Sequence, residues 1–135
     1  MGPNEALVRR WFEEVWNERR EAAIDALFAA DGVGHGLGEP LRGPAGFKPF
    51  WRGLLAAFDD VKITVDGVVE AGDTVALRAT ARLRRAGRDH LLPGLVYTRV
   101  RGGKILESWN SWDCLGLLTE LGHCPRDAMA RLLAR

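Results

Sequence analysis

The chain has 135 residues and a formal net charge of +1, and 47% of its residues are hydrophobic. This length fits a single domain, residues 1–135, and the balanced charge gives no reason to expect nucleic acid or an anionic membrane as a partner. No apolar run reaches membrane-spanning length, the first seven residues lack an apolar signal core, and Cys114 and Cys124 are too few for a disulfide framework. We therefore expect a cytoplasmic protein with free thiols.

The first half of the chain has helical periodicity. Asn4 is a good helix N-cap, and the apolar residues that follow it recur at spacings of three and four: Leu7, Val8, Trp11, Phe12, Val15 and Trp16. We expect a second short helix over 21–28 and a third over about 44–58. The glycine-rich stretch 31–38, which contains His35, predicts a loop or a short strand.

The second half has the period of two that strands show. Alternation predicts strands over 61–66, 75–83, about 91–101 and about 104–113, with hairpin turns at Gly72-Asp73 and Gly102-Gly103. A helical turn over 116–121 and a terminal helix from Pro125 follow. Helices first and a four-strand antiparallel meander second indicate an α+β fold.

The final strand carries the side chains with the clearest chemical meaning. A strict period of two gives one face the residues Ile105, Glu107, Trp109, Ser111 and Asp113. If that face points inward, Asp113 is a candidate general acid/base, because a carboxylate among apolar groups can exchange protons near neutral pH. Alternatively, Asp113 caps the following helical turn. Glu107 is either a second pocket acid or the partner of an arginine, and Asn110 reaches the pocket only if a bulge shifts the strand.

Other candidates come from histidines and aromatic residues. His35 is either a second catalytic residue, which orients a pocket carboxylate or shares a proton with it, or an ordinary loop residue, and we expect His90 at the surface. Tyr97 shares its strand face with arginines, which predicts a position outside the pocket. Aromatic residues at helical spacing belong to the core first, and those we expect to line the pocket as well are Phe12, Trp16, Phe50, Trp51 and Trp109. No histidine and acid pair has ligand spacing, so we expect no metal.

Three segments together resemble one family. They are residues 4–17 (NEALVRRWFEEVWN), residues 27–31 with His35, and residues 103–109 (GKILESW) continued by Trp112-Asp113 and 115–118. These segments resemble the SnoaL-like polyketide cyclase, or ester cyclase, family of the NTF2-like superfamily. The resemblance implies a conical α+β barrel in which N-terminal helices pack on a strongly curved, mainly antiparallel sheet that encloses a pocket. The chain departs from the family at the short segment 85–92 and at Asn110, where members often carry Asp.

The resemblance also implies an activity. The expected function is cofactor-independent acid/base chemistry on a hydrophobic carbonyl substrate, either ring closure of the aldol type or a related isomerisation or dehydration. The alternatives are a non-catalytic small-molecule-binding protein and an epoxide-hydrolase-like enzyme.

The outer face of two strands carries arginines at positions 78, 82, 84, 99 and 101, and either solvent or a second copy of the chain covers them. The resemblance favours a homodimer through this outer sheet face.

Overall fold

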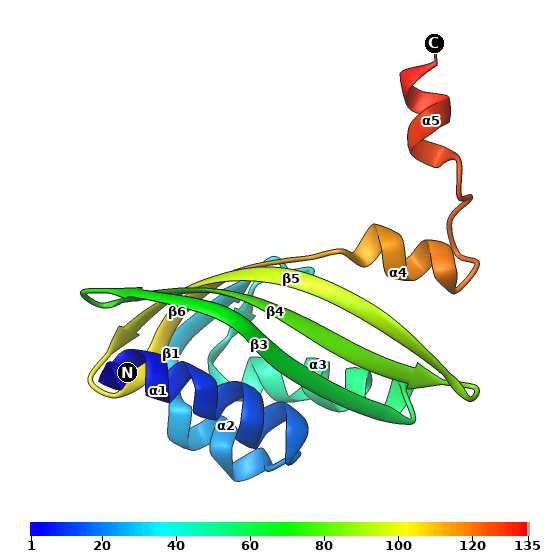
Figure 1. The fold of residues 1–135 in the computed structure, drawn as a ribbon. Helices are drawn as coiled ribbons and strands as arrows, with labels where there is room; N and C mark the ends of the chain where they lie inside the picture. The colour runs from blue at the N-terminus through cyan, green and yellow to red at the C-terminus, as the bar shows by residue number, and fades with distance from the viewer. Residues whose placement is uncertain (135) are drawn as a thin grey trace.

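The computed structural model describes residues 1–134. Its helices are α1 (Pro3–Arg10), the π-helix η1 (Trp11–Asn17), α2 (Glu21–Leu27), α3 (Gly43–Ala57), α4 (Cys114–Glu120) and α5 (Ala128–Leu133). Its strands are β1 (Phe28–His35), β2 (Leu41–Arg42), β3 (Asp60–Ala71), β4 (Thr74–Arg85), β5 (Arg88–Arg101) and β6 (Lys104–Trp112). The strands form one curved, open sheet in the order β2-β1-β6-β5-β4-β3, with the N-terminal helices and α3 on its concave side (Figure 1). The expected α+β architecture is confirmed.

The N-terminal helix is anchored at both ends on the sheet. Its start differs from the prediction that Asn4 is the N-cap: Gly2 holds that position, and the side chain of Asn4 donates to the carbonyl of Gly72 instead. From Trp11 the helix widens into the π-helix η1, which ends where Asn17 pairs with both backbone groups of Ile63 on edge strand β3, at 2.7 and 2.9 Å. The wider turns bury four apolar residues of η1 against the sheet.

The meander β3–β6 forms as predicted, but one hairpin is tighter than expected. Ala86 and Gly87 both have positive φ, so a two-residue turn joins β4 to β5 and β5 begins at Arg88. His90 therefore lies inside the strand with its side chain buried, and its Nδ1 is 3.0 Å from an oxygen of Glu120 on α4. The prediction of a surface position for His90 is wrong, because α4 packs against this end of β5.

A β-bulge in β6 decides which side chains of the last strand face the helices. Arg99 pairs with Glu107, and Val100 pairs with Ile105, so Leu106 is an extra residue in the ladder. Ile105 points inward before the bulge. After the bulge the inward positions are even-numbered, and the odd-numbered ones face outward. The expected inward orientation of Glu107 and Trp109 is therefore wrong.

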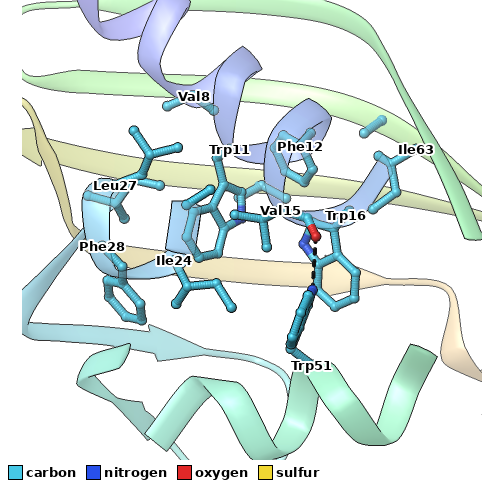
Figure 2. Close-up of a cluster of buried hydrophobic side chains, with 14 of the residues drawn as sticks. Val8, Trp11, Phe12, Val15, Trp16, Ile24, Leu27, Phe28, Trp51 and Ile63 are labelled. Carbon is cyan, nitrogen blue, oxygen red and sulfur yellow. Dashed lines mark hydrogen bonds between the residues drawn. The ribbon is translucent and has the colours of Figure 1, made fainter. Parts of the chain in front are cut away.

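The core lies between the helices and the concave face of the sheet (Figure 2). Buried rings from η1, β1 and α3 meet mostly edge to face, as in the pair Trp11 and Phe28, whose ring centroids are 5.8 Å apart. Trp51 of α3 lies at the edge of this cluster, and its indole Nε1 donates to the carbonyl oxygen of Val15 at 2.9 Å. This hydrogen bond ties α3 to η1.

Of the last two helices, α4 packs against the end of β5, whereas α5 stands clear of the sheet (Figure 1). Leu132 and Leu133 of α5 are exposed. Within residues 1–134, no helix combines the length and the apolar character needed to cross a membrane.

Candidate functional site

A cavity of about 270 Å³ lies between the concave face of the sheet and the helices. Seven aromatic rings line it: Trp11, Phe12, Trp16, Phe28, Phe47, Phe50 and Trp112. Figure 2 shows that the rings of Trp11, Phe12 and Trp16 come from one helical segment. Trp112 closes the wall from β6, where its ring lies against Gly94 in the space that a side chain on β5 would occupy. The cavity is thus built for a mostly apolar occupant.

Four of the residues predicted to contact a substrate do line this cavity. Phe12 and Trp16 reach it from η1, Phe50 from α3, and Asn110 from β6 because of the bulge. Trp51 was predicted to line it as well, but it lies behind the cavity wall, where its ring packs in the core. Trp51 therefore has the core position expected of aromatic residues at helical spacing, and does not line the cavity.

His35, Glu107 and Trp109 come together, but on the outer face of the sheet. The His35 Nε2 is 2.7 Å from a carboxylate oxygen of Glu107, and the imidazole stacks on the ring of Trp109 with centroids 5.5 Å apart. The guanidinium of Arg99 lies 3.7 Å from the other Glu107 oxygen, and Tyr97 contacts Trp109 edge to face. Glu107 is therefore an arginine partner, which is the structural alternative, and Tyr97 lies outside the cavity as predicted.

Asp113 occupies the N-cap position of α4. Its Oδ1 accepts a hydrogen bond from the backbone N–H of Gly116 at 3.0 Å. The side chain does not line the cavity, whereas its neighbour Cys114 does. Capping is one of the two roles the sequence left open for Asp113. The catalytic roles of Asp113 and His35 stay predictions, and the positions of both side chains outside the cavity favour structural roles.

The two hydroxyl side chains of the cavity were not predicted. Thr98 on β5 and Ser108 on β6 face each other across the two strands, and both line the cavity. The amide of Asn110 donates to the Ser108 Oγ at 3.2 Å and to the backbone carbonyl of His35 at 3.0 Å. The doublet Ile105-Leu106 is the one sequence signal of the bulge that turns Ser108 inward, since an extra residue lets two successive apolar side chains pack.

The cavity is electrically neutral. None of the described residues that line it carries a carboxylate, an imidazole or a cationic group, and the thiol of Cys114 is the ionisable side chain among them. The perturbed pKa values lie elsewhere: a hydrogen bond from Arg10 lowers the pKa of Glu14 on the helical surface. Among residues 1–134 no three His, Cys, Asp or Glu side chains are grouped closely enough to hold a metal ion. Neutral hydrogen bonds and apolar contact are what this site offers.

Comparison with known proteins agrees with this architecture. A loop-truncation variant of IdmH is 30% identical, with a TM-score of 0.80 over 88% of this chain and 99% of its own. Wild-type IdmH from Streptomyces antibioticus, proposed to be a polyketide cyclase, is 28% identical, with a TM-score of 0.78 over 88% of this chain and 98% of its own. A proposed SnoaL-like polyketide cyclase from Jannaschia sp. CCS1 shares the fold at 18% identity, with a TM-score of 0.78 over 91% and 94% of the two chains. No curated protein matches the chain significantly in sequence. Residues 8–108 match the model of the SnoaL-like domain, and the chain belongs to this family.

Proposed function

We propose that the protein binds a flat, mostly apolar small molecule that carries a carbonyl group, and acts on it as a cyclase-type enzyme without a cofactor. The observation that carries the proposal is the cavity, whose wall is aromatic and aliphatic except for a few neutral polar groups. The likeness to IdmH at 28–30% identity supports a cyclase over the other activities found on this fold. The fold alone would not favour a cyclase, because the same fold carries many different activities.

The neutral wall shapes the proposed mechanism. Confinement between rings such as Trp16 and Phe50 holds a flexible chain in a folded, near-reactive conformation, which lowers the entropic part of the barrier to ring closure. Hydrogen-bond donors on the wall stabilise negative charge that develops on a carbonyl oxygen. Proton transfer by Asp113 or His35, as first predicted, would require either side chain to leave its present partner and enter the cavity. We therefore propose that confinement and carbonyl polarisation account for most of the lowering of the barrier to ring closure.

A non-catalytic binding protein is the second candidate. The observation that favours it is the lack of a carboxylate or imidazole among the described lining residues, since a general acid/base usually contacts the substrate. The same observation weighs against an epoxide-hydrolase-like activity, which needs a carboxylate to hold a water molecule. Substrate turnover separates an enzyme from a binding protein, whereas occupancy of the cavity is common to both.

A cavity-filling substitution tests occupancy. Ala81 on β4 lines the cavity, and Ala76 on the same strand faces outward. We expect Ala81→Phe to abolish the quenching of tryptophan fluorescence by 9-fluorenone, a flat tricyclic ketone, because the new ring fills the binding volume. Ala76→Phe adds the same ring outside the cavity and is expected to bind the ketone like the wild type. If circular dichroism shows that both variants are folded and they bind the ketone equally, the ligand binds elsewhere and the proposal is contradicted.

The outer sheet face supports the proposal of a homodimer. Leu91, Leu95 and Tyr97 of β5 are 64%, 61% and 49% exposed, and Trp109 of β6 beside them is 39% exposed. A run of large apolar side chains on two adjacent strands, bordered by arginines, has the composition of a protein interface. A second copy of the chain would bury this surface and the His35–Glu107 pair with it.

We also propose that the protein works in the cytoplasm. Cys114 is exposed and Cys124 is half-buried, and both are free thiols. Free thiols of this kind persist in a reducing compartment.

A further inference from the structure

The polar groups of the cavity lie on one small area of the sheet. Thr98 and Ser108 are directly opposite each other on β5 and β6, and Gly34 of β1 is opposite Ser108 on its other side. Side chains in such cross-strand positions have Cβ atoms about 5 Å apart, so two hydroxyl groups there can reach one common atom. Gly34 has no side chain, and a Cβ built on it would lie 3.6 Å from the Ser108 Oγ. The glycine thus leaves the Ser108 hydroxyl uncovered toward the cavity.

The hydrogen bonds around Asn110 fix the direction in which Ser108 can donate. The backbone carbonyl of His35 can only accept, so the amide nitrogen of Asn110 must face it, and this assigns the side-chain orientation. The same nitrogen donates its second hydrogen to the Ser108 Oγ at 3.2 Å. Among residues 1–134, the Ser108 hydroxyl accepts this hydrogen bond and donates none. Its own hydrogen is available to a molecule in the cavity.

Thr98 provides the second donor. Thr98 is only 2% exposed and lines the cavity. Among the described residues no side-chain polar atom is both fully buried and without a hydrogen-bond partner, so the Thr98 hydroxyl, which bonds to no described residue, keeps its small accessible surface in the cavity. A molecule bound in the cavity can accept a hydrogen bond from it there.

We propose that the hydroxyls of Ser108 and Thr98 together bind the carbonyl oxygen of the ligand, and that Asn110 is a positioning residue that holds Ser108 in the donating orientation. The proposal rests on the proposed function, since it assumes that the inner cavity is the binding site. The amide hydrogen bond polarises the Ser108 hydroxyl, and such chains of hydrogen bonds are stronger in a low-dielectric interior. Two neutral donors stabilise negative charge that develops on this oxygen during enolisation or ring closure.

The same geometry narrows the class of ligand. The site offers hydroxyl donors but, among the described lining residues, no arginine, lysine or histidine. A carboxylate ligand would lose its hydration without gaining a cation, which is unfavourable. The structure thus assigns the site to a ketone, aldehyde or quinone with an apolar body, and not to a free acid.

The test compares 9-fluorenone with fluorene, which has the same tricyclic shape without the oxygen. Hydrogen bonding lowers the stretching frequency of a carbonyl group, so we expect bound 9-fluorenone to absorb at a lower infrared frequency than it does in hexane. Ser108→Ala and Thr98→Val each remove one hydroxyl and are expected to reverse part of this shift and weaken ketone binding by roughly two- to ten-fold, leaving fluorene binding unchanged. Asn110→Ala is expected to reduce the infrared shift while fluorene still binds. Ser111→Ala, on the outward side of β6, is the matched control.

Two results would overturn the inference, and they are distinct. If 9-fluorenone competes with fluorene for the cavity but its carbonyl band is the same in wild type, Ser108→Ala and Thr98→Val, the hydroxyl pair does not bind the oxygen, although the proposed function stands. If neither compound binds the wild type, or Ala81→Phe leaves the binding of both unchanged, the cavity is not the site. In that case the proposed function fails, and the inference fails with it.

Discussion

Substitutions of Asp113 can separate a capping role from a catalytic one. Asparagine keeps a side-chain oxygen that accepts from the Gly116 N–H, but it cannot take up a proton; alanine removes both properties. Asn and Asp are comparable N-caps, and replacing such a cap by Ala costs about 1 kcal/mol. If Asp113 is a cap, Asp113→Asn should behave like the wild type and Asp113→Ala should not.

The expected loss is local. Leu117 and Leu121 are the parts of the α4 region that pack against the core, so loosening the first turn of α4 leaves most of the buried apolar surface intact. A loss of about 1 kcal/mol raises the population of the open first turn about five-fold. We therefore expect the Leu117 amide hydrogen, whose acceptor is the backbone carbonyl of residue 113 in every variant, to exchange about five-fold faster in Asp113→Ala than in the wild type or Asp113→Asn, because only alanine removes the cap.

A second assay addresses the chemistry directly. If Asp113 took a proton from a bound ketone, the exchange of the α-hydrogens of 2-tetralone in D₂O, followed by NMR, would slow in Asp113→Asn. We expect this exchange to proceed at the wild-type rate in that variant. Loss of exchange in Asp113→Asn, with the Leu117 amide still protected, would refute the reasoning and make Asp113 a catalytic residue.

Two further predictions concern charge and assembly. A hydrogen bond from Arg10 and the nearby charges of Arg10 and Arg20 lower the pKa of Glu14, so the stabilisation by its carboxylate is present above the unfolded carboxyl pKa of about 4.3 and is lost as the pH falls through the folded pKa. Thermal unfolding should then show Glu14→Gln less stable than the wild type at neutral pH and equal to it in acid; a gap that persists in acid would contradict this. Leu95→Glu should shift a dimer to monomers in sedimentation equilibrium, whereas Ala56→Glu, exposed on α3, should not, and a monomeric wild type would remove the dimer proposal.

Local sequence patterns predict most of the helices and strands. The 3.6-residue period of the helices and the period of two in the meander depend on which residues are apolar, and the hairpin glycines 102 and 103 have the positive φ that their turn requires. The pairing of β1 with β6 was not predictable in this way, because it joins segments about 75 residues apart. It depends on long-range contacts that no local pattern encodes.

The site was predicted less well than the fold, and one residue accounts for much of the difference. With a regular β6, the face containing Ile105 would also contain Glu107 and Trp109, and the cavity would be acidic. Leu106 as an extra residue moves both outward and brings Ser108 and Asn110 inward. A slip of one residue exchanges the two faces of a strand, so an error that is negligible for the fold reverses the chemistry of the site.

The departure from the family at Asn110 agrees with this neutral chemistry. An aspartate here would place a carboxylate oxygen against the backbone carbonyl of His35, where the asparagine now donates a hydrogen bond, and Ser108 would lose the donor that orients it. Lone pairs would oppose each other in an interior of low dielectric, and the acid would be uncharged or the local structure would shift. The amide satisfies the carbonyl and leaves the Ser108 hydroxyl free toward the cavity. The hydrogen bonds that hold this part of the wall together therefore favour a neutral side chain at position 110, which agrees with the proposal that the ligand is not a free acid.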